Sequence, residues 1–75
     1  MEYNALYIQL MNRILDKMRR GEYQVGDKMD SERVMAQQYG INRQTVRKAL
    51  KMLEEEGYIR PLLGKGTFVV KIPEN

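Results

Sequence analysis

The feature that most constrains this chain is the short stretch YGIN, residues 39–42, which separates two helical patterns. Apolar residues recur three or four positions apart on both sides of Gly40: Met35, Ala36 and Tyr39 before it, and Val46, Ala49, Leu50 and Leu53 after it. Gly40 suits the left-handed conformation that ends a helix, Asn42 is a good N-cap for the next helix, and Gly57 can end that one. The stretch therefore predicts two helices joined by a tight turn.

A longer helical pattern precedes this pair. We predict a first helix from Tyr3 to Arg20, ended by Gly21. Its inward stripe is expected to contain Ile8, Met11, Leu15 and Met18, broadened by Tyr7 and Ile14. The glycine-containing segment that follows predicts a loop with a short extended piece near residues 28–29, and Asp30 or Ser31 is then placed to cap the second helix.

The last part of the chain predicts a β-hairpin. In YIRPLLGKGTFVVKI, residues 58–72, β-branched and aromatic residues flank a Gly-Lys-Gly tip, which alone would also suit an ordinary turn. Alternation predicts Phe68, Val70 and Ile72 on one face with Ile59 beneath them, and Pro61 fits an edge strand. Helix, helix-turn-helix and hairpin in this order predict an α+β, mainly α, fold: a winged helix-turn-helix domain over residues 1–75, with the hairpin as the wing.

The residues that are absent exclude several kinds of function. The 75 residues include no cysteine and no histidine, so disulfides, thiolate or imidazole metal sites and the usual nucleophile and base pairs are excluded. We therefore expect no enzyme activity, no catalytic residue, no cofactor and no metal. Apolar runs are too short to cross a bilayer, and the N-terminus carries an acid where a signal peptide has basic charge, so we expect a cytoplasmic protein with no membrane partner.

Positive charge is segregated along the chain, although the net charge is only +3. No acid lies between Glu32 and Glu54, and the basic residues there are Arg33, Arg43, Arg47, Lys48 and Lys51. On the third helix these side chains and Gln44 fall opposite or beside the apolar stripe. Arginine can bond guanine and glutamine can bond adenine through two atoms each, while lysine suits phosphate. The pattern indicates a face directed at a polyanion, with a merely solvated basic face as the alternative.

The segments SERVMAQQYGINRQTVRKALKMLEEEGYIR and GKGTFV resemble the DNA-binding domain of the GntR family of bacterial transcriptional regulators. The similarity extends over essentially the whole chain. Two positions depart from the family pattern: Asp30 stands where proline is usual, and Asn42 stands where serine or threonine often caps the third helix. Asn42 keeps the capping chemistry, whereas Asp30 can either cap the second helix or repel a nearby phosphate.

The resemblance implies a third helix in the major groove of DNA and a wing tip at the minor groove. The predicted base contacts are Arg33, Arg43, Gln44, Thr45 and Arg47. The predicted phosphate contacts are Ser31, Asn42, Lys48 and Lys51, and the predicted wing tip consists of Gly64, Lys65, Gly66 and Thr67.

The resemblance also implies a biological role. We expect sequence-specific binding of double-stranded DNA, at a palindromic operator, by a metabolite-responsive repressor that is a homodimer at full length. The effector-binding and dimerisation domain is expected to be missing from this chain, which alone should be monomeric. The alternative is a winged-helix module that binds protein or RNA without operator specificity.

Overall fold

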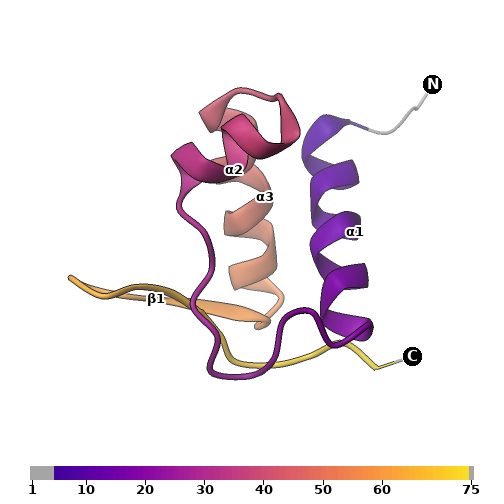
Figure 1. Cartoon of the computed structure of the whole chain (residues 1–75), viewed down its shortest axis with the longest axis vertical. Coiled ribbons are helices and arrows are strands. Elements are labelled where there is room, and N and C mark those ends of the chain that lie inside the picture. Colours follow the sequence, from indigo (N-terminus) through magenta and orange to yellow (C-terminus); the bar gives the residue numbers. More distant parts are fainter. Residues whose placement is uncertain (1–4, 75) are drawn as a thin grey trace.

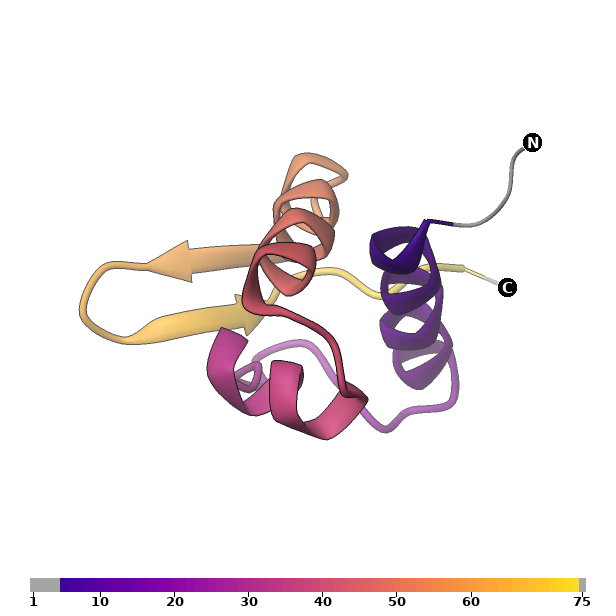
Figure 2. The ribbon, with the colours of Figure 1, turned by 90° about the horizontal axis from the view of Figure 1, so that it is seen from above.

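The computed structural model describes residues 5–74, which form three helices and one two-stranded sheet. The elements are α1 (Leu6–Arg19), α2 (Glu32–Tyr39), α3 (Arg43–Glu55), β1 (Ile59–Leu62) and β2 (Gly66–Val69). In Figure 1, α1 and α3 stand side by side, and Figure 2 shows α2 lying across the start of α3 while the hairpin extends to the side opposite α1. The predicted winged helix-turn-helix fold is confirmed. None of the helices in the described part of the chain has the length and apolar character needed to span a bilayer.

The helix ends follow the expected capping chemistry. The Ser31 hydroxyl accepts a hydrogen bond from the Val34 amide at 3.2 Å, so Ser31 rather than Asp30 caps α2. The Asn42 side-chain oxygen accepts from the Thr45 amide at 2.8 Å and caps α3. Gly40 is left-handed, with φ 68° and ψ 35°. Gly40 and Asn42 fix the turn between α2 and α3, and Ser31 fixes the start of α2.

The first helix begins later than expected and buries a different line of residues. The predicted start at Tyr3 lies outside the described residues, and Ala5 is the extended residue before α1. The buried side chains are Leu10, Ile14 and Met18, whereas Ile8, Met11 and Leu15 are only half-buried. The apolar arc is broad, so periodicity finds the correct side of the helix but not its centre, which is set by packing against α3.

The hairpin pairs antiparallel, and its register corrects the predicted apolar face. Ile59 lies opposite Val69, and these side chains are 3% and 1% exposed. Cross-strand partners project from the same face, so Val69 is the inward residue of β2. The prediction of Phe68, Val70 and Ile72 as that face is wrong: Phe68 and Ile72 are half-buried, Val70 is 38% exposed, and β2 ends at Val69 before the alternation can continue.

The expected extended piece near residues 28–29 lies beside β2. Lys28 forms an isolated antiparallel bridge with Phe68, and the Met29 amide donates to the Thr67 carbonyl at 2.7 Å. β1 is therefore the edge of the pair, which is where Pro61 lies. The loop before α2 thus anchors the base of the wing.

Candidate nucleic-acid interface

The two sides of α3 have opposite character. Val46, Ala49 and Leu53 are completely buried against the rest of the core. The side chains that project to solvent are Arg43, Gln44, Arg47, Lys48 and Lys51, and Thr45 is half-buried between the two sets. The division predicted from the 3.6-residue period is therefore present, and every predicted contact on this helix except Thr45 is exposed.

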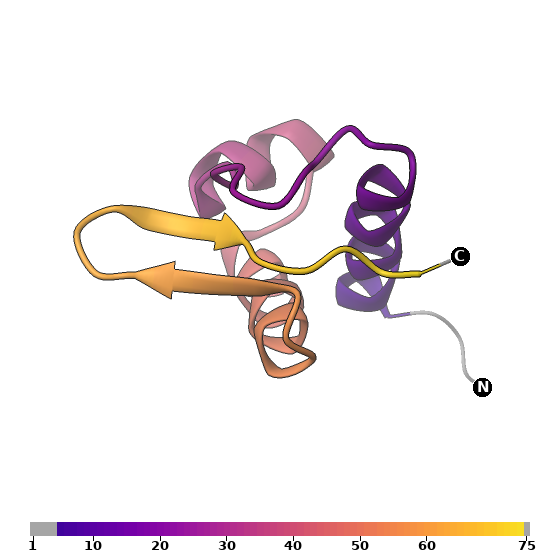
Figure 3. The same ribbon diagram turned by 90° about the horizontal axis from the view of Figure 1, so that it is seen from below.

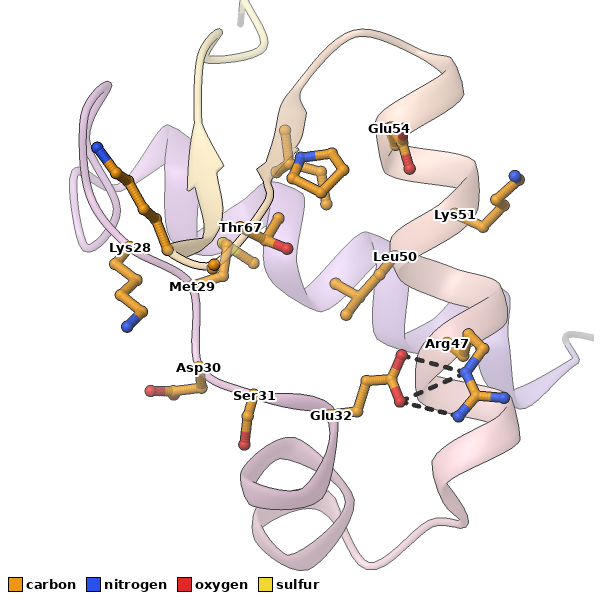
Figure 4. A pocket seen from close by; sticks show the side chains of 15 residues that line it. Lys28, Met29, Asp30, Ser31, Glu32, Arg47, Leu50, Lys51, Glu54 and Thr67 are labelled. Carbon is orange, nitrogen blue, oxygen red and sulfur yellow. Dashed lines mark hydrogen bonds and ion pairs between the residues drawn. The ribbon is translucent and has the colours of Figure 1, made fainter.

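An acidic residue at the start of α2 holds the arginines of α3. The Glu32 carboxylate accepts from Arg47 Nε at 3.2 Å and from Arg47 Nη2 at 3.1 Å, and Arg43 Nη2 lies 3.7 Å from the same carboxylate. The Arg47 hydrogen bonds keep the pKa of Glu32 below its ordinary value, and they raise the pKa of Arg47. Figure 4 shows the two side chains facing each other across a groove.

Sequence reasoning treated Glu32 only as the boundary of a basic segment. Its partner Arg47 is fifteen positions away on another helix, and no local pattern marks such a pair. Its place directly after the Ser31 cap puts it in the first turn of α2. The tight turn at Gly40 then folds α3 back beside it.

The N-terminal end of α1 lies next to the N-terminal end of α3. The Lys48 ammonium is 4.3 Å from the centroid of the Tyr7 ring, a distance that permits a cation–π contact. A shallow depression there is lined by Ala5, Leu6, Tyr7, Asn42, Gln44, Thr45 and Lys48. Asn42, Gln44, Thr45 and Lys48 are thus brought together on one side of the interface, with Tyr7 as a neighbour that the sequence did not reveal.

A second depression of about 600 Å³ separates α3 from the wing. It brings together seven of the predicted contact residues: Ser31, Arg47, Lys51, Gly64, Lys65, Gly66 and Thr67. Lys28 adds a further cation, whereas Asp30, Glu32 and Glu54 add acids to the same groove. Arg33 is exposed on α2 outside it. Among residues 5–74, no cluster of acidic side chains is arranged to hold a metal ion.

The wing reverses direction one residue earlier than its glycines suggested. The Lys65 amide donates to the Leu62 carbonyl at 2.9 Å, which closes a turn with Leu63 and Gly64 at its centre. Gly64 has φ 76°, the positive value that a type II turn requires at its third residue. Gly66 and Thr67 already belong to β2. Leu63, which was not among the predicted contacts, therefore lies in the turn at the tip of the wing.

The chain matches known regulators in sequence and in structure. Residues 6–69 match the family of bacterial regulatory proteins named gntR. The chain is 44% identical over 66 residues to the HTH-type transcriptional repressor NagR of Bacillus subtilis (88% of this chain, 27% of the relative). It is 36% identical over 69 residues to the mannosyl-D-glycerate transport/metabolism system repressor MngR of Escherichia coli (92% and 29%). The chain therefore spans less than a third of the length of these relatives.

Solved structures with the same fold include regulators alone and with DNA. A transcriptional regulator from Oenococcus oeni superposes with a TM-score of 0.88 at 37% identity, over 93% of this chain and 58% of that one. AraR(DBD) in complex with operator ORE1 superposes with a TM-score of 0.85 at 31% identity, over 91% of this chain and 83% of that one. By the span of the family match and the identity to these proteins, the chain belongs to the gntR family of bacterial regulatory proteins.

Proposed function

We propose that this chain is the sequence-specific DNA-binding domain of a metabolite-responsive transcriptional repressor. One observation carries the proposal: the solvent face of α3 presents Arg43, Gln44 and Arg47, while the opposite face is buried in the core. A helix with this division can enter the major groove without disturbing the fold. The relatives named as repressors and the AraR domain in complex with an operator support the same function.

In this proposal α3 lies in the major groove, and five residues read base edges: Arg33, Arg43, Gln44, Thr45 and Arg47. Arginine forms paired hydrogen bonds with guanine O6 and N7, and glutamine does so with adenine N6 and N7. Glu32 already holds Arg47 by hydrogen bonds from both Nε and Nη2, so this arginine reaches the groove partly ordered. Ordering before binding reduces the conformational entropy lost in the complex.

Phosphate contacts are assigned to Ser31, Asn42, Lys48 and Lys51. Ser31 and Asn42 each use a side-chain oxygen to accept the capping bond, which leaves the hydroxyl hydrogen and the amide NH₂ free to donate. The wing tip, Gly64 to Thr67, is assigned to the adjacent minor groove. The depression between α3 and the wing, with Lys28, Lys51 and Lys65 on its walls, would then follow the intervening DNA backbone.

We infer that the operator is palindromic and that the full-length protein binds it as a homodimer. The buried apolar side chains pack into one core formed by the helices and the hairpin, and the relatives are more than three times as long as the matched segment. A separate dimerising domain would raise the effective concentration of the second DNA-binding domain at the second half-site. This can tighten operator binding by a factor of about 10²–10⁴. The isolated chain should be a monomer that binds a half-site weakly.

Selection of bound duplexes from a random pool tests the proposal. A consensus half-site should emerge, and Arg43→Ala or Arg47→Ala should each weaken the selected duplex by about 1–3 kcal/mol with much less effect on random DNA. Arg19→Ala is the matched control, since this exposed arginine pairs with Asp16 at the far end of α1. Equal losses of binding free energy on the selected duplex and on random DNA would show that the two arginines contact phosphates and not base edges. No consensus, or tighter binding to single-stranded RNA, would favour a different kind of module.

A further inference from the structure

One residue of the turn at the tip of the wing is apolar and completely exposed. Leu63 is 103% exposed, and the neighbouring Leu62 is 45% exposed. Figures 1 and 3 show the hairpin projecting beyond the helices, so no other part of the described chain covers this tip. An isolated exposed leucine is ordinary on a protein surface. A leucine in the end turn of a projecting hairpin whose charged residues, Arg60 and Lys65, are both basic is a more specific arrangement.

Positive charge and bare backbone surround this leucine. Lys65 completes the same turn, and the Lys28 side chain crosses the backbone at Gly66, where an added Cβ would lie 2.6 Å from Lys28 Cε. At Gly64 an added Cβ would meet nothing within 4 Å, so the outer side of the turn is open. The tip therefore combines an apolar point, two flanking cations and a thin backbone. The minor groove of DNA has the complementary shape and charge, because two phosphate walls enclose a narrow floor of base edges.

We propose that Leu63 contacts the floor of the minor groove and makes the position beneath the wing discriminate against G·C pairs. This inference rests on the proposed DNA-binding function. An A·T pair presents only the acceptors adenine N3 and thymine O2 in this groove, whereas a G·C pair adds the guanine N2 amino group. Leucine cannot accept a hydrogen bond from that amino group, which also occupies the space the side chain would fill. Lys65, beside it, adds positive charge opposite the phosphates that wall the groove, whatever the base pair.

The position beneath the wing can be located first, because the chain contains no cysteine. A Leu63→Cys variant carrying an iron chelate at the new thiol should cleave the bound operator at sites displaced toward the 3′ ends of both strands, the pattern of minor-groove attack. Cleavage displaced toward the 5′ ends, or none above background, would place Leu63 elsewhere and overturn the inference.

Affinity is then measured on operators that differ only at that base pair. The native chain should bind the A·T duplex about five- to tenfold more tightly than the G·C duplex, the low end of the effect of one base-pair change. Replacing guanine by inosine removes only the N2 amino group and should restore the lost affinity. Leu63→Ala should abolish the discrimination, whereas Val25→Ala, a substitution at another exposed apolar residue, should leave it intact.

The possible failures are distinguishable from one another. If the chain selects no operator at all, the proposed function fails. If it binds its operator but treats A·T, G·C and inosine·C alike, only the role of Leu63 is overturned. If the chain dimerises at high concentration and Leu63→Ala abolishes the dimer, then Leu63 contacts a second copy of the chain. That result would also overturn the proposed role of Leu63 in the minor groove. Thermal unfolding of Leu63→Ala should match that of the native chain, since the side chain has no contact to lose.

Discussion

Replacing Gly40 isolates the contribution of backbone geometry to the helix-turn-helix. The residue has φ 68° and ψ 35°, and a Cβ added there would meet no atom within 4 Å. The effect of a side chain is therefore conformational strain and not a clash. The left-handed conformation is about 1–2 kcal/mol unfavourable for an L-residue. Among the three replacements, asparagine tolerates the left-handed conformation best, so Gly40→Asn should destabilise the domain least. Gly40→Ala should destabilise it more, and Gly40→Val most, because the β-branch of valine restricts the backbone further.

These energies are large for a domain of this size. At about 0.05–0.15 kcal/mol per residue, a chain of 75 residues is stable by only about 4–11 kcal/mol. In a small domain about 1 kcal/mol corresponds to about 4–8 °C in the melting temperature, so Gly40→Val should lower it by about 8–16 °C for about 2 kcal/mol. The melting temperature of Gly40→Ala should lie between those of Gly40→Val and Gly40→Asn. Alanine lowers the conformational entropy of the unfolded chain, and this offsets part of the strain in the folded state.

Thermal and urea unfolding, followed by circular dichroism, would measure the series. Gln37→Val is the matched control, because Gln37 is exposed in α2 with ordinary helical geometry, and its effect should stay within about 0.5 kcal/mol. An unchanged melting temperature in Gly40→Val, or a loss in Gly40→Asn as large as in Gly40→Val, would refute the reasoning. At a temperature where Gly40→Asn is fully folded, it should bind DNA as the native chain does.

Three further results are expected. Lys51→Ala and Lys65→Ala should weaken binding to all sequences alike and reduce the salt slope by about one unit each; an unchanged slope would remove them from the phosphate contacts. Glu32→Gln removes the charge that holds Arg47 in place, so the ratio of operator affinity to random-DNA affinity should fall, although the change also removes an acid from the proposed DNA-binding side. A constant or rising ratio would contradict the positioning role of Glu32. Burial, followed by the charge of a neighbouring aspartate, raises the pKa of Tyr23 to about 12 from 10.0. Folding therefore favours the protonated phenol of Tyr23. Its contribution to the free energy of unfolding is fully present below pH 10 and is lost as the pH rises toward 12. Urea titrations of the native chain and Tyr23→Phe should show a steeper alkaline loss for the native chain, and parallel curves would exclude this contribution.

Features determined by a few adjacent residues could be predicted from the sequence. The capping bond of Asn42 spans three positions, and the left-handed turn at Gly40 depends on that residue alone. The buried side of α3 followed from its period: Val46, Ala49 and Leu53 of the predicted stripe are buried, and Leu50 at its edge is half-buried. Local chemistry and helical geometry were sufficient in these cases.

Features determined by pairing between distant segments could not be predicted in the same way. The inward face of β2 depends on the register that sets Ile59 opposite Val69, and a shift of one residue exchanges the faces. The centre of the buried line in α1 depends on how that helix rests against α3. The pairs Glu32 with Arg47 and Tyr7 with Lys48 join separate helices, so each becomes visible only when the helices are placed.

The same helix forms the centre of the core and the centre of the proposed interface. Val46 is completely buried, and Arg47, the next residue, projects into the groove, because each step along a helix turns the side chain by about 100°. Any change in the packing of α3 therefore moves the arginines. The angle between α2 and α3 is held by the turn at Gly40, by buried contacts on one side and by the ion pair from Glu32 on the other. An exposed ion pair contributes little to stability, so its main effect here is on the conformation of Arg47, the arginine proposed to contact DNA.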